Sequence, residues 1–259
     1  MPTCAIVIPC YNEADRLNCD VIRGYLATSP DRRILFVDDG STDSTLRLLE
    51  QLHQEVPAQI RVLHQERNAG KGEAVRVGLL NALGTDAEVV GFWDADLATP
   101  LSAIDDLLDV LDSRPGVDIV LGSRVKLLGR TIERRASRHY LGRVFATCAS
   151  LALGLAVYDT QCGAKLFRAG PYLKKLLERP FLSRWIFDVE ILARYIGLHG
   201  GDLEASASRI YEFPLYCWRD VGGSKVRPKD FLRAAIDLFV IRKNFPSFRR
   251  SYKPAAQSN

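Results

Sequence analysis

The regular alternation of short apolar runs with longer helical segments is the feature that most limits how this chain can fold. Between the runs, apolar residues recur three and four positions apart, as at Leu46, Leu49 and Leu52, which is the period of an amphipathic helix. Successive β-α units form parallel sheets that helices cover on both faces. We therefore predict an α/β, Rossmann-like fold with a mostly parallel central sheet. The β-rich runs lie at residues 5–9, 33–39, 60–64, 88–96 and 117–123.

The pattern changes after residue 123, where longer helices and further strands are predicted. An apolar run at residues 144–157 is too short to cross about 30 Å of hydrocarbon as a helix, so we interpret it as a buried helix. We expect one domain over residues 1–227, followed at 228–259 by an amphipathic helix and a polar tail. The predicted elements are helices over 131–157, 186–198 and 229–244 and strands over 164–168 and 209–216.

Charge and cysteine content argue against several classes of protein. Lys and Arg number 35 against 31 Asp and Glu, and the net charge of +4 is too small for a protein that coats nucleic acid through charge alone. The 6 cysteines form no C-x-x-C pair and do not cluster with the 4 histidines, which indicates reduced thiols and no zinc site. Because the N-terminal residues do not have the pattern of a secretory signal, we expect a cytoplasmic location.

Two aspartates, Asp94 and Asp96, end the fourth predicted strand and precede Pro100. Because ligands bind outside the carboxyl ends of parallel strands, we expect these carboxylates at the binding edge of the sheet. Neighbouring carboxylates repel unless a cation separates them, and Mg²⁺ binds one or two carboxylates together with water and substrate phosphates. The pair therefore predicts a site for Mg²⁺ or Mn²⁺ that carries a diphosphate. The alternative is that Asp96 caps the helix that begins near Pro100.

The glycine-rich segment at residues 67–78 is not a P-loop, because Gly72 stands where that motif needs Ser or Thr. We expect Gly70 and Gly72 to let the chain pass close to a ligand, with Lys71 free to meet an anion. The alternative is that Gly70 only forms part of a loop and has no role in binding. The segment VDDGSTDST at residues 37–45 also has two interpretations, as a binding loop or as a simple strand-to-helix turn.

Arg130, Arg134 and Arg138 are spaced four residues apart, so if this stretch is helical they form one cationic ridge. Guanidinium groups bind phosphate through paired hydrogen bonds, and the ridge therefore predicts a phosphate site. The alternative is an ordinary solvated basic face. Further cations that could join or flank the ridge are Arg135, Arg143, Lys225 and Arg227.

A series of motifs runs along residues 4–227 in the order IVIPCYNE, VDDGSTDST, NAGKGEAVRVG, DADLATP, GSR, DTQCGAKLFR and RWIFDVEIL. Each motif is common by itself, but the ordered set resembles the inverting family-2 glycosyltransferases of the GT-A fold. Within that family, the chain is most similar to the polyprenyl-phosphate sugar synthases, specifically the dolichyl-phosphate β-glucosyltransferase branch. The resemblance implies a GT-A fold and a metal-dependent glycosyltransferase.

The resemblance also implies roles for residues at the matching positions. Asp94 and Asp96 would bind the metal and, through it, the diphosphate; Asp39 would accept a hydrogen bond from the base; and Arg124 would meet a phosphate. Mannosyl-phosphate synthases carry a Gln, a further metal ligand, at the position of Ala98, so one protein ligand fewer is expected here. The residues expected to bind the nucleotide sugar are Pro9, Tyr11, Glu13, Val37, Asp39, Lys71, Asp94, Ala95, Asp96 and Arg124.

On the acceptor side, the resemblance implies a phosphate site with Arg134 and Arg138, to which Lys225 could add from a glycine-rich loop. Asp188 lies near the position where relatives that glycosylate hydroxyls place a catalytic base. A phosphate acceptor is already anionic and needs no base, so Asp188 would then orient the acceptor or a positive neighbour. The alternative is that Asp188 is an ordinary carboxylate in the first turn of a helix, with no role at the site. Further carboxylates in this part of the chain are Asp159 and Glu190, and the expected catalytic set is Asp94, Asp96, Arg124 and Asp188.

The function implied is transfer of a sugar, with glucose from UDP-glucose as the first choice, onto a polyprenyl phosphate such as dolichyl or undecaprenyl phosphate. One alternative is a transferase of the same fold that glycosylates a hydroxyl with Asp188 as base. Others are a polyprenyl-phosphate mannosyltransferase that uses GDP-mannose and a nucleotide-sugar-binding module without turnover. No nucleic acid partner is expected.

Residues 231–250 carry apolar side chains at helical intervals and end in a basic, aromatic cluster. Such a helix can lie in an anionic membrane surface, so we expect peripheral contact with the cytoplasmic face of a membrane. Packing of this helix on the domain core is the alternative, and a membrane-anchored partner protein is another route to the lipid.

Overall fold

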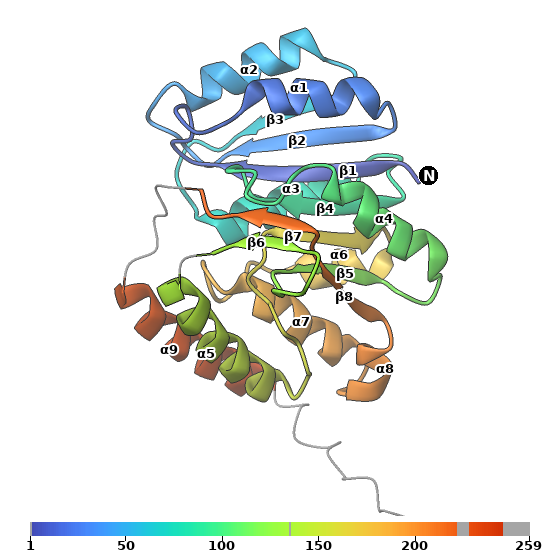
Figure 1. Ribbon diagram of the computed structural model, residues 1–259, viewed down its shortest axis with the longest axis vertical. Coiled ribbons are helices and arrows are strands. Elements are labelled where there is room, and N and C mark those ends of the chain that lie inside the picture. Colours follow the sequence, from blue (N-terminus) through green and yellow to red (C-terminus); the bar gives the residue numbers. More distant parts are fainter. Residues whose placement is uncertain (1, 135, 222–227, 246–259) are drawn as a thin grey trace, which may run out of the picture.

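The computed structural model describes residues 2–134, 136–221 and 228–245 of the 259-residue chain. Its strands are β1 (Cys4–Cys10), β2 (Arg32–Asp38), β3 (Ile60–His64), β4 (Val89–Trp93), β5 (Ile119–Ser123), β6 (Thr131–Glu133), β7 (Ala164–Arg168), β8 (Ile210–Pro214) and β9 (Cys217–Arg219). A 7-stranded sheet with the order β3-β2-β1-β4-β7-β5-β8 forms the centre (Figure 1). Neighbouring strands are parallel except at β7, which runs antiparallel to β4 and β5. A separate 2-stranded parallel sheet pairs β6 with β9.

Helices cover both faces of the sheet, which confirms the prediction from the β-α pattern. They are α1 (Cys19–Thr28), α2 (Thr45–Glu55), α3 (Lys71–Ala82), α4 (Ala103–Ser113), α5 (Ala136–Leu153), α6 (Pro171–Leu177), α7 (Phe187–Leu198), α8 (Leu203–Ala207) and α9 (Pro228–Asn244). One hydrophobic core lies between the sheet and α1, α2 and α4, and contains Ile22, Leu49 and Ile104. The other lies against α3, α5, α6, α7 and α9, and contains Val75 and Ala149. Successive residues of a strand alternate between the two cores.

The parallel strands bring their carboxyl ends to one edge of the sheet. The ends of β1 and β2 are tied together there, because the Asp39 amide donates to the Cys10 carbonyl at 2.8 Å. Strand β7 reaches the same edge from the opposite direction, since its first residue, Ala164, pairs with Trp93 at the end of β4. The antiparallel strand therefore places the segment that precedes it, residues 159–163, beside the loop that follows β4.

The predicted helix over residues 131–157 is wrong at its beginning. Thr131 and Ile132 form strand β6 and pair with Cys217 and Trp218, and helix α5 begins at Ala136. The β-branched pair fits the pleated surface of a strand better than a helix. A cationic ridge on a continuous helix from Arg130 onward therefore does not exist.

The interpretation of residues 144–157 as a buried helix holds for one face of α5, which ends at Leu153, and is wrong for the other. Ala146, Ala149 and Leu153 are buried on the side of α5 that faces the domain, whereas Val144 and Leu151 are exposed. The C-terminal amphipathic helix is confirmed as α9, which contacts α5 and α7. Within the described residues, no helix is both long and apolar enough to cross a membrane.

Close packing of α3 on the sheet predicts a stability difference between two glycine substitutions. A Cβ at Gly78 would overlap the side chain of Val7 and lie 2.9 Å from Val37 Cγ2, so Gly78→Ala should lower the free energy of unfolding by about 1–3 kcal/mol. Gly24, in helix α1, has nothing within 4 Å of such a Cβ, so Gly24→Ala should raise it by about 0.5–1 kcal/mol. Urea unfolding measures both, and equal shifts in the two variants would contradict this packing.

Candidate active site

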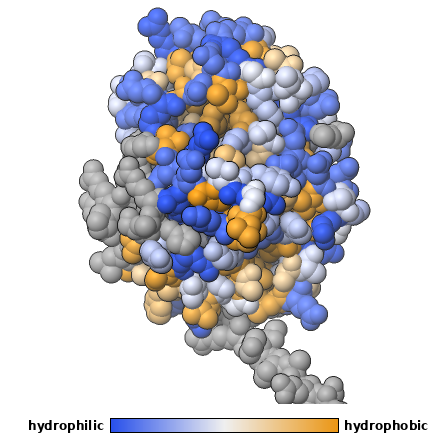
Figure 2. Space-filling view, in the orientation of Figure 1, coloured by the Kyte–Doolittle hydropathy of each residue, from blue (hydrophilic) through white to orange (hydrophobic). Residues whose placement is uncertain are grey.

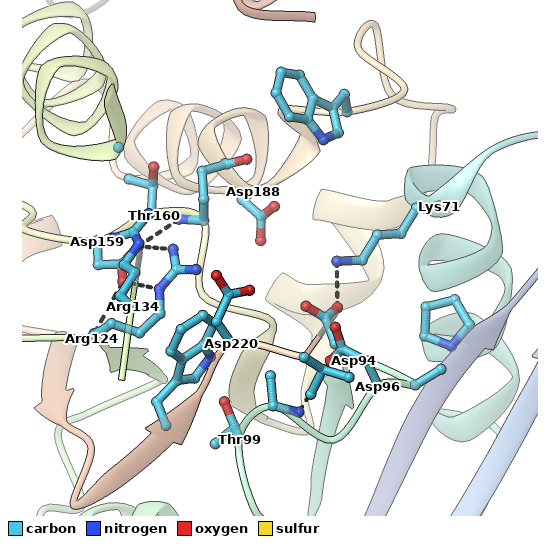
Figure 3. Close-up of a pocket in the computed structure, with 18 of the residues that line it drawn as sticks. Lys71, Asp94, Asp96, Thr99, Arg124, Arg134, Asp159, Thr160, Asp188 and Asp220 are labelled. Atoms are coloured by element: carbon cyan, nitrogen blue, oxygen red, sulfur yellow. Dashed lines mark hydrogen bonds and ion pairs between the residues drawn. The ribbon is translucent and has the colours of Figure 1, made fainter. Parts of the chain in front are cut away.

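A cavity of about 370 Å³ opens at the carboxyl edge of the sheet (Figure 3). Its walls come from the loops after β1, β4, β5 and β9, from the segment before β7, and from α5 and the beginning of α7. Asp94, Asp96 and Lys71 lie on one side, Arg124 and Arg134 lie on the other together with Asp159, and Asp188 and Asp220 lie between them. The cavity therefore has an acidic end and a basic end.

Asp94 anchors the acidic end. Its amide donates to the Gly163 carbonyl at 2.9 Å, and its carboxylate forms an ion pair with Lys71 at the start of α3. A Cβ on Gly163 would overlap the Asp94 carboxylate, so the glycine leaves the space that this side chain occupies. Burial by itself would raise the pKa of Asp94, but the ammonium of Lys71 together with the charges of Lys165 and Arg124 holds the pKa below its usual value. Asp94 is therefore a carboxylate at neutral pH.

Asp96 lies on the same side of the cavity and carries a less favourable charge. One carboxylate oxygen accepts a hydrogen bond from the Ala98 amide at 3.1 Å, and the other lies 3.4 Å from the Arg16 guanidinium. Burial and then the charge of Asp94 raise the pKa of Asp96. Asp96 does not cap the next helix, since Ser102 is the N-cap residue of α4. The backbone of Leu97 turns there with φ of 50°, a conformation that is uncommon outside glycine.

The two aspartates fit a divalent cation that arrives with a phosphate ligand. Both carboxylates line the cavity, and their mutual repulsion is the interaction that a doubly charged cation relieves. In the part of the chain that the structure describes, no group of three or more His, Cys, Asp or Glu side chains could hold a metal. Mg²⁺ typically binds to one or two carboxylates and completes its shell with water and substrate phosphates. The donor set therefore suits a metal shared with a diphosphate better than a permanently bound one.

Arg124 is held at the basic end by a paired interaction with Asp159. Its Nε and Nη2 donate to the two carboxylate oxygens at 2.6 and 2.7 Å, and its backbone amide donates to the same carboxylate at 3.0 Å. Burial alone would lower the pKa of Arg124, but the charge and hydrogen bonds of Asp159, together with the charge of Asp94, keep that pKa above its usual value. The guanidinium also lies 5.3 Å from the ring centre of Trp218. Arg124 is therefore a fixed cation, with Asp159 already occupied as its partner.

Arg134, the second cation at this end, has no carboxylate partner among the described residues. Among the described residues its guanidinium makes no hydrogen bond or ion pair, and it packs so closely on Gly142 of α5 that a Cβ there would overlap it. Burial and then the charge of Arg124 lower the pKa of Arg134 to about 10, so it stays protonated at neutral pH. The hydroxyl of Thr160, a fully buried residue in the same wall, also lacks a partner within the described chain. Two neighbouring guanidinium groups and a hydroxyl form an environment that an anion would stabilise.

A buried ion pair lies beside the cavity and includes one of its lining residues, Asp188. Lys165 of β7 is fully buried, and its ammonium donates to the Cys162 carbonyl at 2.5 Å and lies 2.6 Å from the Asp188 carboxylate. The Asp188 carboxylate points into the cavity from the first turn of α7 (Figure 3). Burial raises the pKa of Asp188, and the charge of Lys165 opposes that effect. Asp188 thus has a positive neighbour that fixes its orientation.

Several residues expected at the nucleotide site do not line the cavity, although Pro9, Glu13 and Ala95 do. Val37 is fully buried in the core beneath α3, and Tyr11 lies on the surface. Asp39 accepts hydrogen bonds from the amides of Ala69 and Gly70 at 2.7 and 2.9 Å. Its carboxylate therefore shapes the loop that presents Lys71, and contact of Asp39 with a base stays a prediction.

Of the arginines expected to form a phosphate site, only Arg134 lines the cavity among the described residues. Arg130 stacks on the Tyr216 ring at 3.5 Å, and Arg143 stacks on Tyr158 at the same distance and donates to its carbonyl. Arg134 alone of the described candidates in this cluster reaches the cavity wall. The predictions for Arg135, Lys225, Arg227 and the side chain of Arg138 lie outside the described residues.

Some site residues carried no signal in the sequence. Arg16 bridges Glu13 and Asp96, and Lys165 pairs with Asp188, yet each looks like an ordinary basic residue in its own segment. Gly163 was part of a recognised motif, but its close approach to Asp94 depends on the antiparallel placement of β7. Glycines 70 and 72 pack on Arg184 and Phe187, so the structure gives them a packing role.

Comparison with known proteins gives a consistent family and fold. Residues 5–174 match the family described as Glycosyl transferase family 2. The chain is 34% identical over 263 residues to the dolichyl-phosphate beta-glucosyltransferase of Saccharomyces cerevisiae, covering 92% of this chain and 73% of that protein. It is 29% identical over 227 residues to the polyprenol monophosphomannose synthase of Mycolicibacterium smegmatis, covering 85% and 80%.

Among solved structures, glucosyl-3-phosphoglycerate synthase from Mycobacterium tuberculosis, crystallised with Mn²⁺, UDP and its product, superposes with a TM-score of 0.64. The identity is 20%, and the match covers 95% of this chain and 81% of that one. At this identity the likeness concerns the fold alone, and it confirms the GT-A fold implied by the motifs.

The buried pair of Lys165 and Asp188 predicts strong coupling between two substitutions. Lys165→Met should lower the free energy of unfolding by about 3–5 kcal/mol, because it leaves the Asp188 carboxylate buried without its partner. The double variant Lys165→Met with Asp188→Leu should recover most of that loss, since replacing both charges removes the unpaired group. A double-mutant cycle from urea unfolding measures the coupling. Additive losses in the two single variants would contradict the pairing.

Proposed function

Because the chain belongs to glycosyl transferase family 2, we propose that it transfers a sugar from a nucleoside diphosphate sugar to a polyprenyl phosphate. Several relatives that are 32–34% identical to this chain are dolichyl-phosphate beta-glucosyltransferases, which supports glucose as the sugar and UDP-glucose as the donor. The similarity to a polyprenol monophosphomannose synthase supports GDP-mannose as the second candidate donor. Both candidates share the same class of acceptor.

The observation that carries this proposal is the division of one cavity into an acidic end and a basic end. Asp94 and Asp96 suit a metal and a diphosphate, and Arg134 beside Arg124 suits a second, separate phosphate. A transferase that joins a sugar nucleotide to a lipid phosphate must bind two anions close together. A hydroxyl acceptor would offer no negative charge to Arg134, which has no ion-pair partner in the described part of the chain.

At the donor end, Asp94 and Asp96 would hold Mg²⁺ or Mn²⁺, and the chemistry that such a metal supplies is charge neutralisation on the departing diphosphate. Lys71 adds a positive charge at the same place, since its ammonium lies against Asp94. The loop that presents Lys71 is fixed by the hydrogen bonds from Ala69 and Gly70 to Asp39. These residues would therefore bind and orient the leaving group.

At the acceptor end, Arg134 would bind the lipid phosphate and direct one oxygen toward the anomeric carbon. Attack from the face opposite the leaving diphosphate forms the new bond as the old one breaks, which inverts the configuration. The phosphate is already anionic, so no base has to remove a proton. The rate enhancement would come from positioning and from preorganised positive charge.

The rival function, transfer to a hydroxyl, would need Asp188 as a base. Burial raises the pKa of this carboxyl, which would suit a base, but one of its oxygens lies 2.6 Å from the Lys165 ammonium. We propose that Asp188 instead contacts substrate hydroxyls as a fixed acceptor. Asp188→Asn in a transferase of the rival type would abolish turnover at all pH values, whereas the proposed role predicts a raised KM with part of kcat retained.

The protein must reach a lipid substrate, and we propose peripheral contact with the cytoplasmic face of a membrane. The pattern of free cysteines supports a reducing compartment. A membrane-anchored partner protein is a second route to the same location. We also propose that residues 1–227 act as the catalytic domain, with the helix at 228–244 as a support that contacts α5 and α7.

The metal role of Asp96 predicts a large and specific loss of activity. Asp96→Ala should lower kcat/KM for sugar transfer at saturating Mn²⁺ by at least about a hundredfold, because the leaving group loses its neutralisation. Asp112→Ala, which removes an exposed aspartate from the last turn of α4, is the matched control and should leave activity unchanged. Product is followed by mass spectrometry of the glycosylated lipid. Transfer that persists in Asp96→Ala would rule out this mechanism.

The acceptor role of Arg134 predicts a change confined to one substrate. Arg134→Gln should raise the KM for a short-chain prenyl phosphate by about ten- to a hundredfold, the loss expected for hydrogen bonds to a charged group. Affinity for UDP, measured by calorimetry, should stay the same. Arg130→Gln provides the control, because that guanidinium stacks on Tyr216 and does not line the cavity. Equal effects of both variants, or weaker UDP binding in Arg134→Gln alone, would contradict the assignment.

A further inference from the structure

Helix α5 exposes a row of apolar side chains on the face directed away from the protein. Tyr140, Val144 and Leu151 are 71%, 64% and 71% exposed, and their spacing places them on one side of the helix. Leu141 widens the same face. The opposite face of α5 is buried through Ala149 and its neighbours, so the helix is apolar on both sides. A helix of this kind in a water-soluble setting usually has another apolar surface as its partner.

Helix α9 extends this surface. Ile236 and Phe239 are 57% and 69% exposed, and Lys243 follows on the same face four residues after Phe239. Arg233 and Arg242 are exposed at the sides of this face. The inner face of α9 is buried against the domain, so these outward residues are not needed for its packing.

The two helices lie side by side at one end of the molecule (Figure 1). Figure 2 shows apolar residues along this lower edge, next to strongly hydrophilic ones. We name the exposed row of α5 together with that of α9 the α5–α9 surface. Its members are Tyr140, Leu141, Val144, Leu151, Ile236 and Phe239.

We propose that the α5–α9 surface docks on an anionic lipid bilayer. Apolar side chains flanked by exposed Lys and Arg are the combination that binds a helix to the headgroup region of a negatively charged membrane. An apolar patch on a partner protein would not require cations on this surface. Arg233, Arg242 and Lys243 all lie among or beside the exposed apolar side chains of α9, which favours an anionic bilayer. The choice of a bilayer as occupant also rests on the proposed lipid acceptor.

The same helix connects this surface to the cavity. Phe145 and Ala146 line the cavity from the inner side of α5, while Val144 and Leu151 face outward. Because a helix with its side chains is about 10 Å across, a bilayer on the outer face would lie roughly one helix diameter from the cavity wall. A lipid phosphate could then enter the basic end while its hydrocarbon chain stays in the membrane.

The test uses the full chain and vesicles that contain no prenyl phosphate. Wild-type protein should sediment with phosphatidylcholine vesicles that contain phosphatidylglycerol, and added salt or omission of phosphatidylglycerol should weaken the binding. The variant with Val144→Glu, Leu151→Glu and Phe239→Glu should bind at least about tenfold more weakly. The replaced side chains are exposed, so the thermal midpoint should stay close to that of the wild type.

A matched control is Val21→Glu, which changes an exposed apolar residue on α1, far from α5 and α9 in Figure 1, and should bind like the wild type. Wild-type protein that does not bind anionic vesicles would overturn the proposal, as would equal binding by the triple variant. A dimer in lipid-free sedimentation velocity that the triple variant dissociates would overturn it too, because the surface would then join two copies.

A second readout separates this proposal from the proposed function. The triple variant should transfer sugar to a short-chain, water-dispersed prenyl phosphate at the wild-type rate. If wild-type protein transfers sugar to that acceptor but does not bind vesicles, the docking surface is wrong and the function stands. If it binds vesicles but produces no glycosylated lipid with any donor, the function is wrong and the docking surface stands.

Discussion

Buried charge at the carboxyl edge of the sheet is the constraint on which the rest of this structure depends. Asp159 and Asp188 are buried and Asp94 is partly buried, and each faces a basic side chain: Arg124, Lys165 and Lys71, respectively. A buried carboxylate without such a partner would cost several kcal/mol, on the order of 3–5. The strand order satisfies this need, because β7 inserts antiparallel between β4 and β5 and carries both Lys165 and the segment with Asp159 to the edge. Asp96 differs in that burial and the charge of Asp94 raise its pKa even though the Arg16 guanidinium lies 3.4 Å away, so a bound cation would improve the charge balance there.

The sequence predicted the parts of this arrangement that depend on local pattern. The β-α rhythm predicted the parallel strands and the two helical layers, and the strand ends predicted that Asp94 and Asp96 meet at the edge. The pairings of Lys165 with Asp188 and of Arg124 with Asp159 could not be predicted, because the antiparallel insertion that creates them has no signature within any one segment. The arginine ridge failed for a different reason. Three arginines at helical spacing imply a shared face only on a helix, and Thr131 and Ile132 instead pair with β9.

The acidic and basic ends of the cavity give a physical reason for a transferase that uses two anionic substrates. Burial and Asp94 raise the pKa of Asp96 at the acidic end, and burial and Arg124 lower the pKa of Arg134 at the basic end, so a metal with a diphosphate and a lipid phosphate would each stabilise the charged side chain at one end. Helix α5 lies between the cavity and the surface: one of its faces borders the cavity, and the other is apolar and exposed. The same helix can therefore serve a reaction between a water-soluble donor and a membrane-bound acceptor.

The central claim is that the aspartate end of the cavity binds a metal together with the diphosphate of the donor. An anomalous difference map from crystals grown with Mn²⁺ and UDP tests it most directly. The account predicts a manganese peak in contact with the carboxylates of Asp94 and Asp96 and with the UDP diphosphate, with the Lys71 ammonium beside that diphosphate. Manganese bound elsewhere, or UDP bound outside this cavity while Lys71 still occupies Asp94, would contradict it.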